Sequence, residues 1–331
     1  MPDRVREALR FLLRRNVVRN VFLVFFVAMM VQLWMFAQWA SGASTVAVPR
    51  PEAVAGFIPV GALMSLFAWL KTGQWDTVLP AGIVIILSAT LLSLVLKRGF
   101  CGWICPVGAL FQIPADFGKR LRKGKDLKVW RWLDLTLRGL RYAFAAALVM
   151  AAIAIPLSIS IPFRQYEFYW IADLKIVSLF VHPPLWWAVL AVAFLGLSVA
   201  YGNVWCRWIC PLGGIYGFVG LGSPTNVVRD EDACTRCGKC AKACPNRVPV
   251  NKLVVVRAPE CDGCQTCVRT CPEPGALGPR FLTRWAMPWW SWPVLAVGVW
   301  LGLYAIAVLT GHWHTGLTLE QFQQALRSMP L

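Results

Sequence analysis

Acidic residues are scarce in this sequence, which has 16 Asp and Glu against 33 Lys and Arg among 331 residues. The net charge of +17 would suit a nucleic-acid partner, but the basic residues lie between long apolar runs, where they act as topology signals. We therefore expect no nucleic-acid binding. The sequence also lacks a Cys-x-x-Cys-His haem motif and the glycine patterns of Rossmann and P-loop sites.

Charged residues of both signs make up only 15% of the chain, and hydrophobic residues make up 58%. The mean hydropathy is +0.57, which is typical of a membrane protein rather than a soluble domain. The first apolar block is too long for a signal peptide, so we expect no cleavable signal. We predict an α-helical polytopic protein of the bacterial inner membrane. Its apolar blocks suggest about five transmembrane helices, near residues 21–40, 77–96, 137–155, 185–201 and 289–310.

The distribution of basic residues predicts the orientation. Residues 97–141 contain eleven basic and three acidic residues, and residues 206–288 contain eleven and six. The positive-inside rule places both segments and the N-terminus in the cytoplasm and the C-terminus in the periplasm. Residues 53–70 are apolar but interrupted by glycine and proline, and counting them as a span would place 97–141 outside. We therefore predict an interfacial or re-entrant element there.

Two cysteine runs define the centre of the sequence. Each has three cysteines at three-residue spacing and a fourth four residues later, followed by proline, as in bacterial two-cluster ferredoxins. In such proteins the fourth cysteine ligates the cluster of the other run. We therefore predict two [4Fe–4S] clusters, one held by Cys234, Cys237, Cys240 and Cys271, the other by Cys261, Cys264, Cys267 and Cys244. A structural zinc site does not require the repeated third cysteine or the Cys-Pro pattern.

A second cysteine motif, Cys-x-x-x-Cys-Pro, occurs twice, after the second and fourth predicted helices. Its members are Cys101 and Cys105 in one copy and Cys206 and Cys210 in the other. Such a repeat indicates a duplicated two-helix module, which would bring all four thiols to the inner edge of the membrane. There they would hold a third metal centre or act as dithiol/disulfide pairs. The structural alternative is that they pack as small apolar side chains.

Aromatic and acidic residues gather in the two predicted outer loops. Aromatic rings beside a carboxylate suit a quinol head group, which must lose protons as well as electrons. An interfacial aromatic belt would have the same composition. The candidates for a quinone site are Trp75, Asp76, Tyr166, Glu167, Trp170, Asp173 and His182.

These features divide the chain into four parts. The predicted order is a basic cytoplasmic N-terminus (1–20), a four-helix membrane domain (21–215), a cytoplasmic α+β two-cluster ferredoxin-like domain (216–288), and a fifth span with a periplasmic tail (289–331). Within the tail, Thr318–Gln321 predicts a capping box that opens a short amphipathic helix.

The basic N-terminus, the paired Cys-x-x-x-Cys-Pro motifs and the two-cluster module resemble the NapH-type membrane quinol dehydrogenases over about residues 10–285. The wider superfamily includes NosR-like and CcoG-like proteins. The resemblance implies that the chain takes electrons from the membrane quinone pool and passes them towards a periplasmic reductase or its iron–sulfur or haem carrier. The family's cluster and motif positions correspond to the twelve cysteines named above. The fifth helix and tail depart from this pattern, which leaves the pathway open. The CcoG-like alternative implies a copper-reducing assembly factor, and a third alternative is a relay from a cytoplasmic donor.

Overall fold

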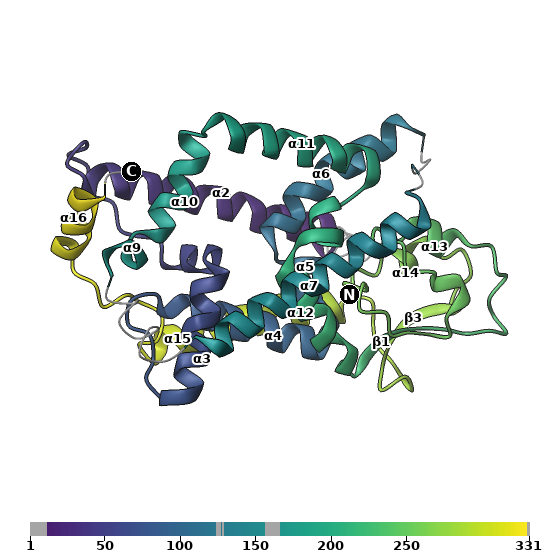
Figure 1. The fold of residues 1–331 in the computed structure, drawn as a ribbon. Coiled ribbons are helices and arrows are strands. Elements are labelled where there is room, and N and C mark those ends of the chain that lie inside the picture. Colours follow the sequence, from purple (N-terminus) through teal and green to yellow (C-terminus); the bar gives the residue numbers. More distant parts are fainter. Residues whose placement is uncertain (1–11, 124–126, 128, 156–165, 330–331) are drawn as a thin grey trace. The chain divides into compact units, whose positions relative to one another are not determined.

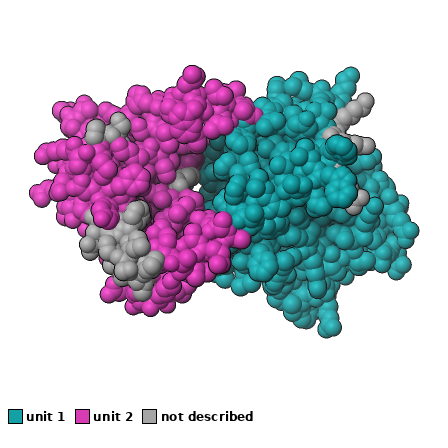
Figure 2. Space-filling model, in the orientation of Figure 1, with its two compact units in different colours: residues 1–23, 89–145, 194–300 teal, residues 24–88, 146–193, 301–331 magenta. Residues whose placement is uncertain are grey.

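The computed structural model describes all residues except 1–11, 124–126, 128, 156–165 and 330–331 (Figure 1). The chain forms two compact units, and each unit is made of three segments that are separate in the sequence (Figure 2). Unit 1 comprises residues 1–23, 89–145 and 194–300, and unit 2 comprises residues 24–88, 146–193 and 301–331. The ferredoxin-like segment therefore shares one unit with the start of the chain and with both Cys-x-x-x-Cys-Pro motifs.

The structure is mostly helical. The principal helices are α2 (Arg15–Ala40), α3 (Pro59–Thr72), α4 (Pro80–Leu96), α5 (Gly99–Trp103), α6 (Pro106–Leu121), α7 (Arg131–Ala154), α9 (Glu167–Trp170), α10 (Ala172–Val181), α11 (Leu185–Tyr201), α12 (Pro211–Val219), α15 (Ser291–Leu309) and α16 (Leu319–Ser328). Short 3-10 turns cover Glu52–Phe57, Gly220–Gly222 and Val250–Lys252, and a π-helical turn covers Trp205–Ile209.

Among the described residues, three helices are long and apolar enough to cross a membrane, namely α2, α7 and α15. The pair α10 and α11 would be a fourth span, but it is bent by 77° at a short break. Helix α4 has 17 residues, or about 25 Å at 1.5 Å per residue, somewhat less than the ~30 Å hydrocarbon core. The chain therefore has transmembrane features, whereas the count of five spans remains a prediction. Residues 53–70 form a 3-10 turn and α3, which is not among the candidate spans.

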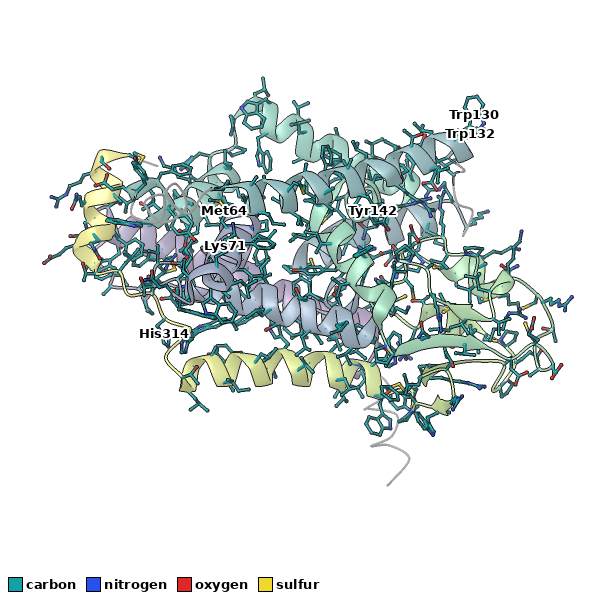
Figure 3. All side chains as sticks on the ribbon, turned by 60° about the horizontal axis from the view of Figure 1, so that its bottom comes forward. Met64, Lys71, Trp130, Trp132, Tyr142 and His314 are labelled. Atoms are coloured by element: carbon teal, nitrogen blue, oxygen red, sulfur yellow. The ribbon has the colours of Figure 1, made fainter. Side chains whose placement is uncertain are left out.

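Two predicted helix starts are wrong. Helix α2 begins at Arg15 rather than near residue 21, because Arg15 is buried and paired with Asp262 and no longer has to remain in water. Helix α7 begins at Arg131 rather than near 137. Trp130 and Trp132, 79% and 74% exposed, project outward at its start (Figure 3), as interfacial anchors do. The predicted bounds of α11 are confirmed.

The ferredoxin-like segment combines a small antiparallel sheet with two one-turn helices. The strands lie in the order β2-β1-β3-β4, and Val227 pairs with Val256 on one side and with Pro279 on the other. The core of unit 1 includes Leu96, Trp103 and Trp292 together with two cysteines of the ferredoxin runs. The elements are β1 (Thr225–Arg229), α13 (Lys239–Ala243), β2 (Val255–Val256), α14 (Thr266–Thr270), β3 (Leu277–Phe281) and β4 (Trp285–Ala286).

The tail helix α16 packs within unit 2. Its capping box is confirmed, because Thr318 and Gln321 exchange side-chain to backbone hydrogen bonds. Its apolar face buries Phe322, Ala325 and Leu326 in a core shared with α2 and α10. The tail is therefore an integral part of unit 2.

Candidate metal centres

The two ferredoxin runs adopt the same local backbone. In each run the residues two and four positions after the first cysteine are left-handed: Arg236 and Gly238 in one, Gly263 and Gln265 in the other. Alternation of this kind turns successive N–H groups towards one concavity, the geometry found at many iron–sulfur sites. The third cysteine then lies in α13 or α14, and the fourth caps that helix. The two runs have the same cysteine spacing and thus adopt the same backbone conformation.

The first predicted ligand set lines a single cavity. Cys234, Cys237, Cys240 and Cys271 all face a space of about 20 Å³ in unit 1. Cys271 comes from the other run, so cysteines of both runs line this cavity. Across the described residues, no three Cys, His, Asp or Glu side chains converge tightly enough to hold a single metal ion.

The second predicted set is more deeply buried. Burial raises the pKa of Cys267 well above its usual value, and the neighbouring thiols of Cys264, Cys261 and Cys244 raise it further. The four thiols therefore lie close enough to interact electrostatically. Burial likewise raises the pKa of Cys261 to about 12. Such thiols remain protonated at neutral pH unless a bound metal centre stabilises the thiolates.

The two Cys-x-x-x-Cys-Pro motifs adopt similar local structures. Cys105 and Cys210 each cap a helix that begins with proline, α6 and α12, and their backbone angles nearly coincide (φ −57°, ψ 117° and φ −58°, ψ 111°). The second cysteine of each motif is therefore outside the helical conformation, which a following proline disfavours. A short helical turn precedes each one, and in the second copy it is π-helical, a form often found at functional sites.

The two motifs lie against each other. A Cβ placed on Gly108, three residues after Cys105, would be 3.9 Å from the Cys206 Sγ and 3.2 Å from the Cys101 carbonyl oxygen. Burial raises the pKa of Cys105 to about 12, and the Cys101 and Cys210 thiols add to the effect. The structure thus brings Cys101, Cys105, Cys206 and Cys210 together as one group, named here the four-cysteine site.

Two buried cations beside the cysteines provide a test of whether these sites suit an anionic cluster. Arg98 is 3% exposed, and its Nη2 would lie 2.9 Å from a Cβ on Gly213, next to the Cys210 loop. Lys97 is 1% exposed. In the described part of the chain, Lys97 Nζ and Arg98 Nε have no hydrogen-bond partner. A buried cation needs a counter-charge, and four thiolates around a [4Fe–4S] core leave a net negative charge. The residues present therefore fit such clusters.

The four-cysteine site makes direct backbone contact with the second ferredoxin run. A Cβ on Gly102 would lie 2.2 Å from the Asp262 carbonyl oxygen, so only glycine allows this approach. Trp103 donates a hydrogen bond from Nε1 to the Gly263 carbonyl over 3.2 Å. Arg15 donates hydrogen bonds to both segments, to the Gly102 carbonyl over 3.0 Å and to the Asp262 carboxylate over 2.8 Å. Gly102 follows Cys101 directly, and Asp262 follows Cys261.

The seven candidate quinone-site residues all lie in unit 2, where several of them have partners elsewhere in the chain. Asp173 is fully buried and bonded to Arg50 over 2.7 Å. Glu167 accepts hydrogen bonds from Gln324 and Ser328 of the tail helix. His182 contacts the Trp34 ring, Trp170 packs in the apolar cores, and Tyr166 is 64% exposed. Asp173 and Glu167 thus have structural partners that their place in the sequence does not reveal.

Trp75 and Asp76 lie just before α4, and Trp75 packs against the same apolar core as Trp170. Asp76 is buried and accepts hydrogen bonds from Tyr169 over 2.9 Å, from Ser65, and from the Val78 backbone over 2.8 Å. Sequence reasoning missed Ser65 and Tyr169, because contacts between residues 65, 76 and 169 leave no local pattern. Trp75 packs its ring on His312, with centroids 4.9 Å apart, and its buried Nε1 has no hydrogen-bond partner among the described residues.

Comparisons with known proteins match the same segments. A "4Fe-4S binding domain" family matches residues 78–125 and 183–224, which hold the two Cys-x-x-x-Cys-Pro motifs. A "4Fe-4S dicluster domain" family matches residues 226–272, which hold both ferredoxin runs. No solved structure matches the chain.

Several curated proteins are similar over long stretches. The chain is 32% identical to YccM of Escherichia coli (strain K12) over 312 residues, covering 91% of this chain and 86% of YccM. It is 27% identical to the ferredoxin-type protein NapH of Haemophilus influenzae, covering 60% of this chain and 66% of NapH. It is 28% identical to the methylamine utilization ferredoxin-type protein MauN of Methylorubrum extorquens, covering 58% of this chain and 62% of MauN.

The fold and the cysteine sites define a class: a ferredoxin-type 4Fe-4S electron-transport protein with transmembrane helices. Within that class, the chain belongs to the NapH-like family of membrane ferredoxin-type proteins.

Proposed function

We propose that this protein oxidises membrane quinol and passes the electrons through three [4Fe–4S] clusters towards a periplasmic reductase system. The observation that carries the proposal is the backbone contact between Gly102 and Asp262, which places the four-cysteine site directly beside the second ferredoxin run. Similarity to NapH and MauN supports the respiratory setting. The ferredoxin-like segment lies on the cytoplasmic face of the inner membrane in this proposal, with five spans and the C-terminus in the periplasm.

The proposed ligand sets follow the cysteine groups in the structure. The first cluster is held by Cys234, Cys237, Cys240 and Cys271, the second by Cys261, Cys264, Cys267 and Cys244, and the third by the four-cysteine site. A [4Fe–4S] cluster supplies one-electron transfer. Lys97 and Arg98 supply buried positive charge beside these sites, which favours the more negative, reduced form of a nearby cluster.

Quinol oxidation releases two electrons and two protons, so the quinol site needs a proton acceptor as well as an electron acceptor. We place this site at Trp75 and Asp76 in unit 2. The buried Trp75 Nε1 can donate a hydrogen bond to a quinol oxygen. The buried Asp76 carboxylate, which accepts a hydrogen bond from Tyr169, follows Trp75 directly in the sequence and is the proposed proton acceptor.

Addition of a quinol under anaerobic conditions tests the proposed activity. Reduced menadiol should reduce the clusters of the purified full-length protein and produce their EPR signals. Trp75→Phe, which removes the indole N–H but retains an aromatic ring, should slow this reduction about tenfold or more. Trp285→Phe, at an exposed position on β4, is the matched control and should not change the rate. If menadiol produced no signal while dithionite did, quinol oxidation would be ruled out.

Crosswise ligation can be tested by comparing cysteine variants from the two ferredoxin runs. Cys271→Ser should remove the same cluster as Cys237→Ser, because both side chains line one cavity although they belong to different runs. The two variants should therefore give the same residual EPR spectrum, with iron reduced by about four atoms per protein. Cys264→Ser should give a different residual spectrum. A Cys271→Ser spectrum matching that of Cys264→Ser would instead show that each run ligates its own cluster.

A further inference from the structure

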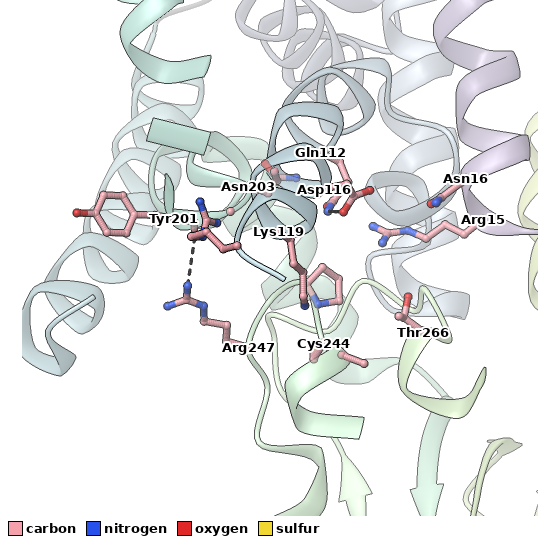
Figure 4. Close-up of a pocket in the computed structure, with 15 residues that line it drawn as sticks. Arg15, Asn16, Gln112, Asp116, Lys119, Tyr201, Asn203, Cys244, Arg247 and Thr266 are labelled. Carbon is pink, nitrogen blue, oxygen red and sulfur yellow. Dashed lines mark hydrogen bonds between the residues drawn. The ribbon is translucent and has the colours of Figure 1, made fainter. Parts of the chain in front are cut away.

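Two surface features of unit 1 differ in polarity. The first is a cavity of about 160 Å³ beside Cys244, lined by polar groups such as Asn203 and Arg247 (Figure 4). Walls of this kind suit water rather than hydrocarbon. The second is the tip of the hairpin of β3 and β4, where Phe281 is 38% and Leu282 is 50% exposed. Apolar groups that gather on a surface commonly mark an interaction site, so the tip is a candidate for contact with an apolar partner.

The hairpin tip is held rigidly. Phe281 lies opposite Trp285 across the hairpin, and the two rings stack with centroids 6.0 Å apart. The Leu282 N–H donates to the Pro224 carbonyl over 2.8 Å, which fixes the turn beside the start of β1. Leu282 and Thr283 have left-handed backbone angles (φ 46° and 64°), which glycine or asparagine would adopt with less strain. The turn therefore keeps an exposed apolar side chain at a conformational cost.

The apolar surface continues from the tip towards helix α4. Leu221 is 44% exposed, and a Cβ placed on the next residue, Gly222, would be 3.8 Å from Leu94 Cδ1. Leu94 lies in the last turn of α4 and is 46% exposed. The Ser223 hydroxyl donates to the Val95 carbonyl over 2.8 Å, which fixes this segment to α4. The four exposed residues that these contacts connect are named here the apolar ridge: Leu94, Leu221, Phe281 and Leu282.

The base of the hairpin is joined to the start of α15, a candidate membrane span. Leu277 of β3 and Trp292 of α15 lie in the same hydrophobic core. Trp290, which is 47% exposed, directly precedes α15, as residues of an interfacial aromatic belt do. Trp285 is six residues before Ser291, the first residue of α15, a stretch of at most about 21 Å. The hairpin tip therefore lies close to the level at which α15 would enter the bilayer.

The charge around the tip is positive. Arg280 and Arg284 flank Phe281 and Leu282 in the sequence, and no acidic residue occurs from 274 to 319. An arginine beside apolar groups can extend its side chain along them and place its charge among lipid head groups. Anionic head groups attract such charges. An apolar tip between two arginines thus matches a bilayer surface that contains anionic lipid.

We infer that the β3–β4 hairpin inserts its apolar tip into the interfacial region of the membrane and holds the ferredoxin-like segment against the bilayer. Phe281 and Leu282 enter the boundary between head groups and acyl chains, and Arg280 and Arg284 contact anionic head groups. The rest of the apolar ridge contacts the lipid beside α4. This inference does not depend on quinol oxidation.

Photo-cross-linking of the full-length protein in lipid nanodiscs tests the inference. The photoreactive residue p-benzoylphenylalanine, introduced in place of Leu282, should form adducts with phospholipid that mass spectrometry detects. The same residue in place of Lys252 is the matched control, because Lys252 is exposed in the ferredoxin-like segment outside the hairpin. We expect at least about tenfold more lipid adduct at position 282, since the control side chain remains in water. The iron content of each variant shows whether its fold is intact.

Charge variants test the contribution of the arginines. In nanodiscs with equal amounts of phosphatidylglycerol and phosphatidylcholine, Arg280→Gln with Arg284→Gln should lower the share of phosphatidylglycerol among the adducts at position 282 severalfold. Lys239→Gln with Lys242→Gln removes the same charge from exposed positions outside the hairpin and should leave this share unchanged.

Equal yields of lipid adduct at positions 282 and 252 would overturn the inference. Adducts between two copies of the protein in place of lipid adducts would also overturn it, because the tip would then be a protein interface. An unchanged share of phosphatidylglycerol in the double arginine variant would overturn the role assigned to Arg280 and Arg284.

Discussion

Replacing Cys206 by serine is expected to lower the iron content from about twelve to about eight atoms per protein, since each [4Fe–4S] cluster holds four irons. The reason is the position of the Cys206 Sγ, which faces the first Cys-x-x-x-Cys-Pro motif across Gly108. The two ferredoxin clusters should remain, because their proposed ligands lie in separate groups. Iron and labile-sulfide analysis, with EPR of the reduced protein, measures the loss.

Cys101→Ser serves as the companion variant. It lies in the other copy of the motif, so it should cause the same loss if all four cysteines share one centre. A wild-type protein with only about eight irons would refute a third cluster and favour a dithiol role for the four-cysteine site. Different iron losses in the two variants would show that the copies act separately.

Gly102→Ala should have the second large effect. The added Cβ would lie 2.2 Å from the Asp262 carbonyl oxygen, which is part of the backbone and cannot rotate away. Overpacking of this kind typically costs about 1–3 kcal/mol, and here it would separate the four-cysteine site from the second ferredoxin run. We expect a lower thermal midpoint and, after quinol addition, slower reduction of the ferredoxin clusters relative to the four-cysteine site. Rapid-freeze EPR would resolve the two steps.

Gly139→Ala is the matched control for this variant. Gly139 lies inside α7, and a Cβ there would meet nothing within 4 Å. Because alanine favours the helix interior by roughly 0.5–1 kcal/mol, this variant should be unchanged or slightly more stable. An equal thermal midpoint and equal electron-transfer rates in Gly102→Ala and wild type would contradict the proposed junction.

Several features could be predicted because they depend on local spacing. The bounds of α11, the cap of the tail helix and the extended conformation of Cys105 and Cys210 all follow from residues within a few positions of one another. Helix α10 was not predicted, although residues 172–181 are largely apolar. Its ten residues are too few for a membrane span, so the segment was interpreted as part of an outer loop.

For the candidate quinone site, the sequence did not show which carboxylates have partners elsewhere in the chain. Composition alone groups Asp173 and Glu167 with Asp76, because all three lie near aromatic residues in predicted loops. In the structure Asp173 is neutralised by Arg50 and Glu167 binds the tail helix, partners that are 123 and more than 150 residues away. A carboxylate's availability depends on such distant partners, and composition does not report them.

The sequence by itself determined the chemistry of this protein: two ferredoxin runs, a repeated Cys-x-x-x-Cys-Pro motif, and apolar helices between basic segments. Such patterns are local, because ligand spacing and helix length involve residues that are close in the chain. Only the tertiary structure decided which cysteines meet and that Gly102 contacts Asp262. It also decided that Lys97 and Arg98 are buried beside the cysteine sites. These features depend on packing between segments that are not adjacent in the sequence, as in the close approach of the Gly102 and Asp262 backbones.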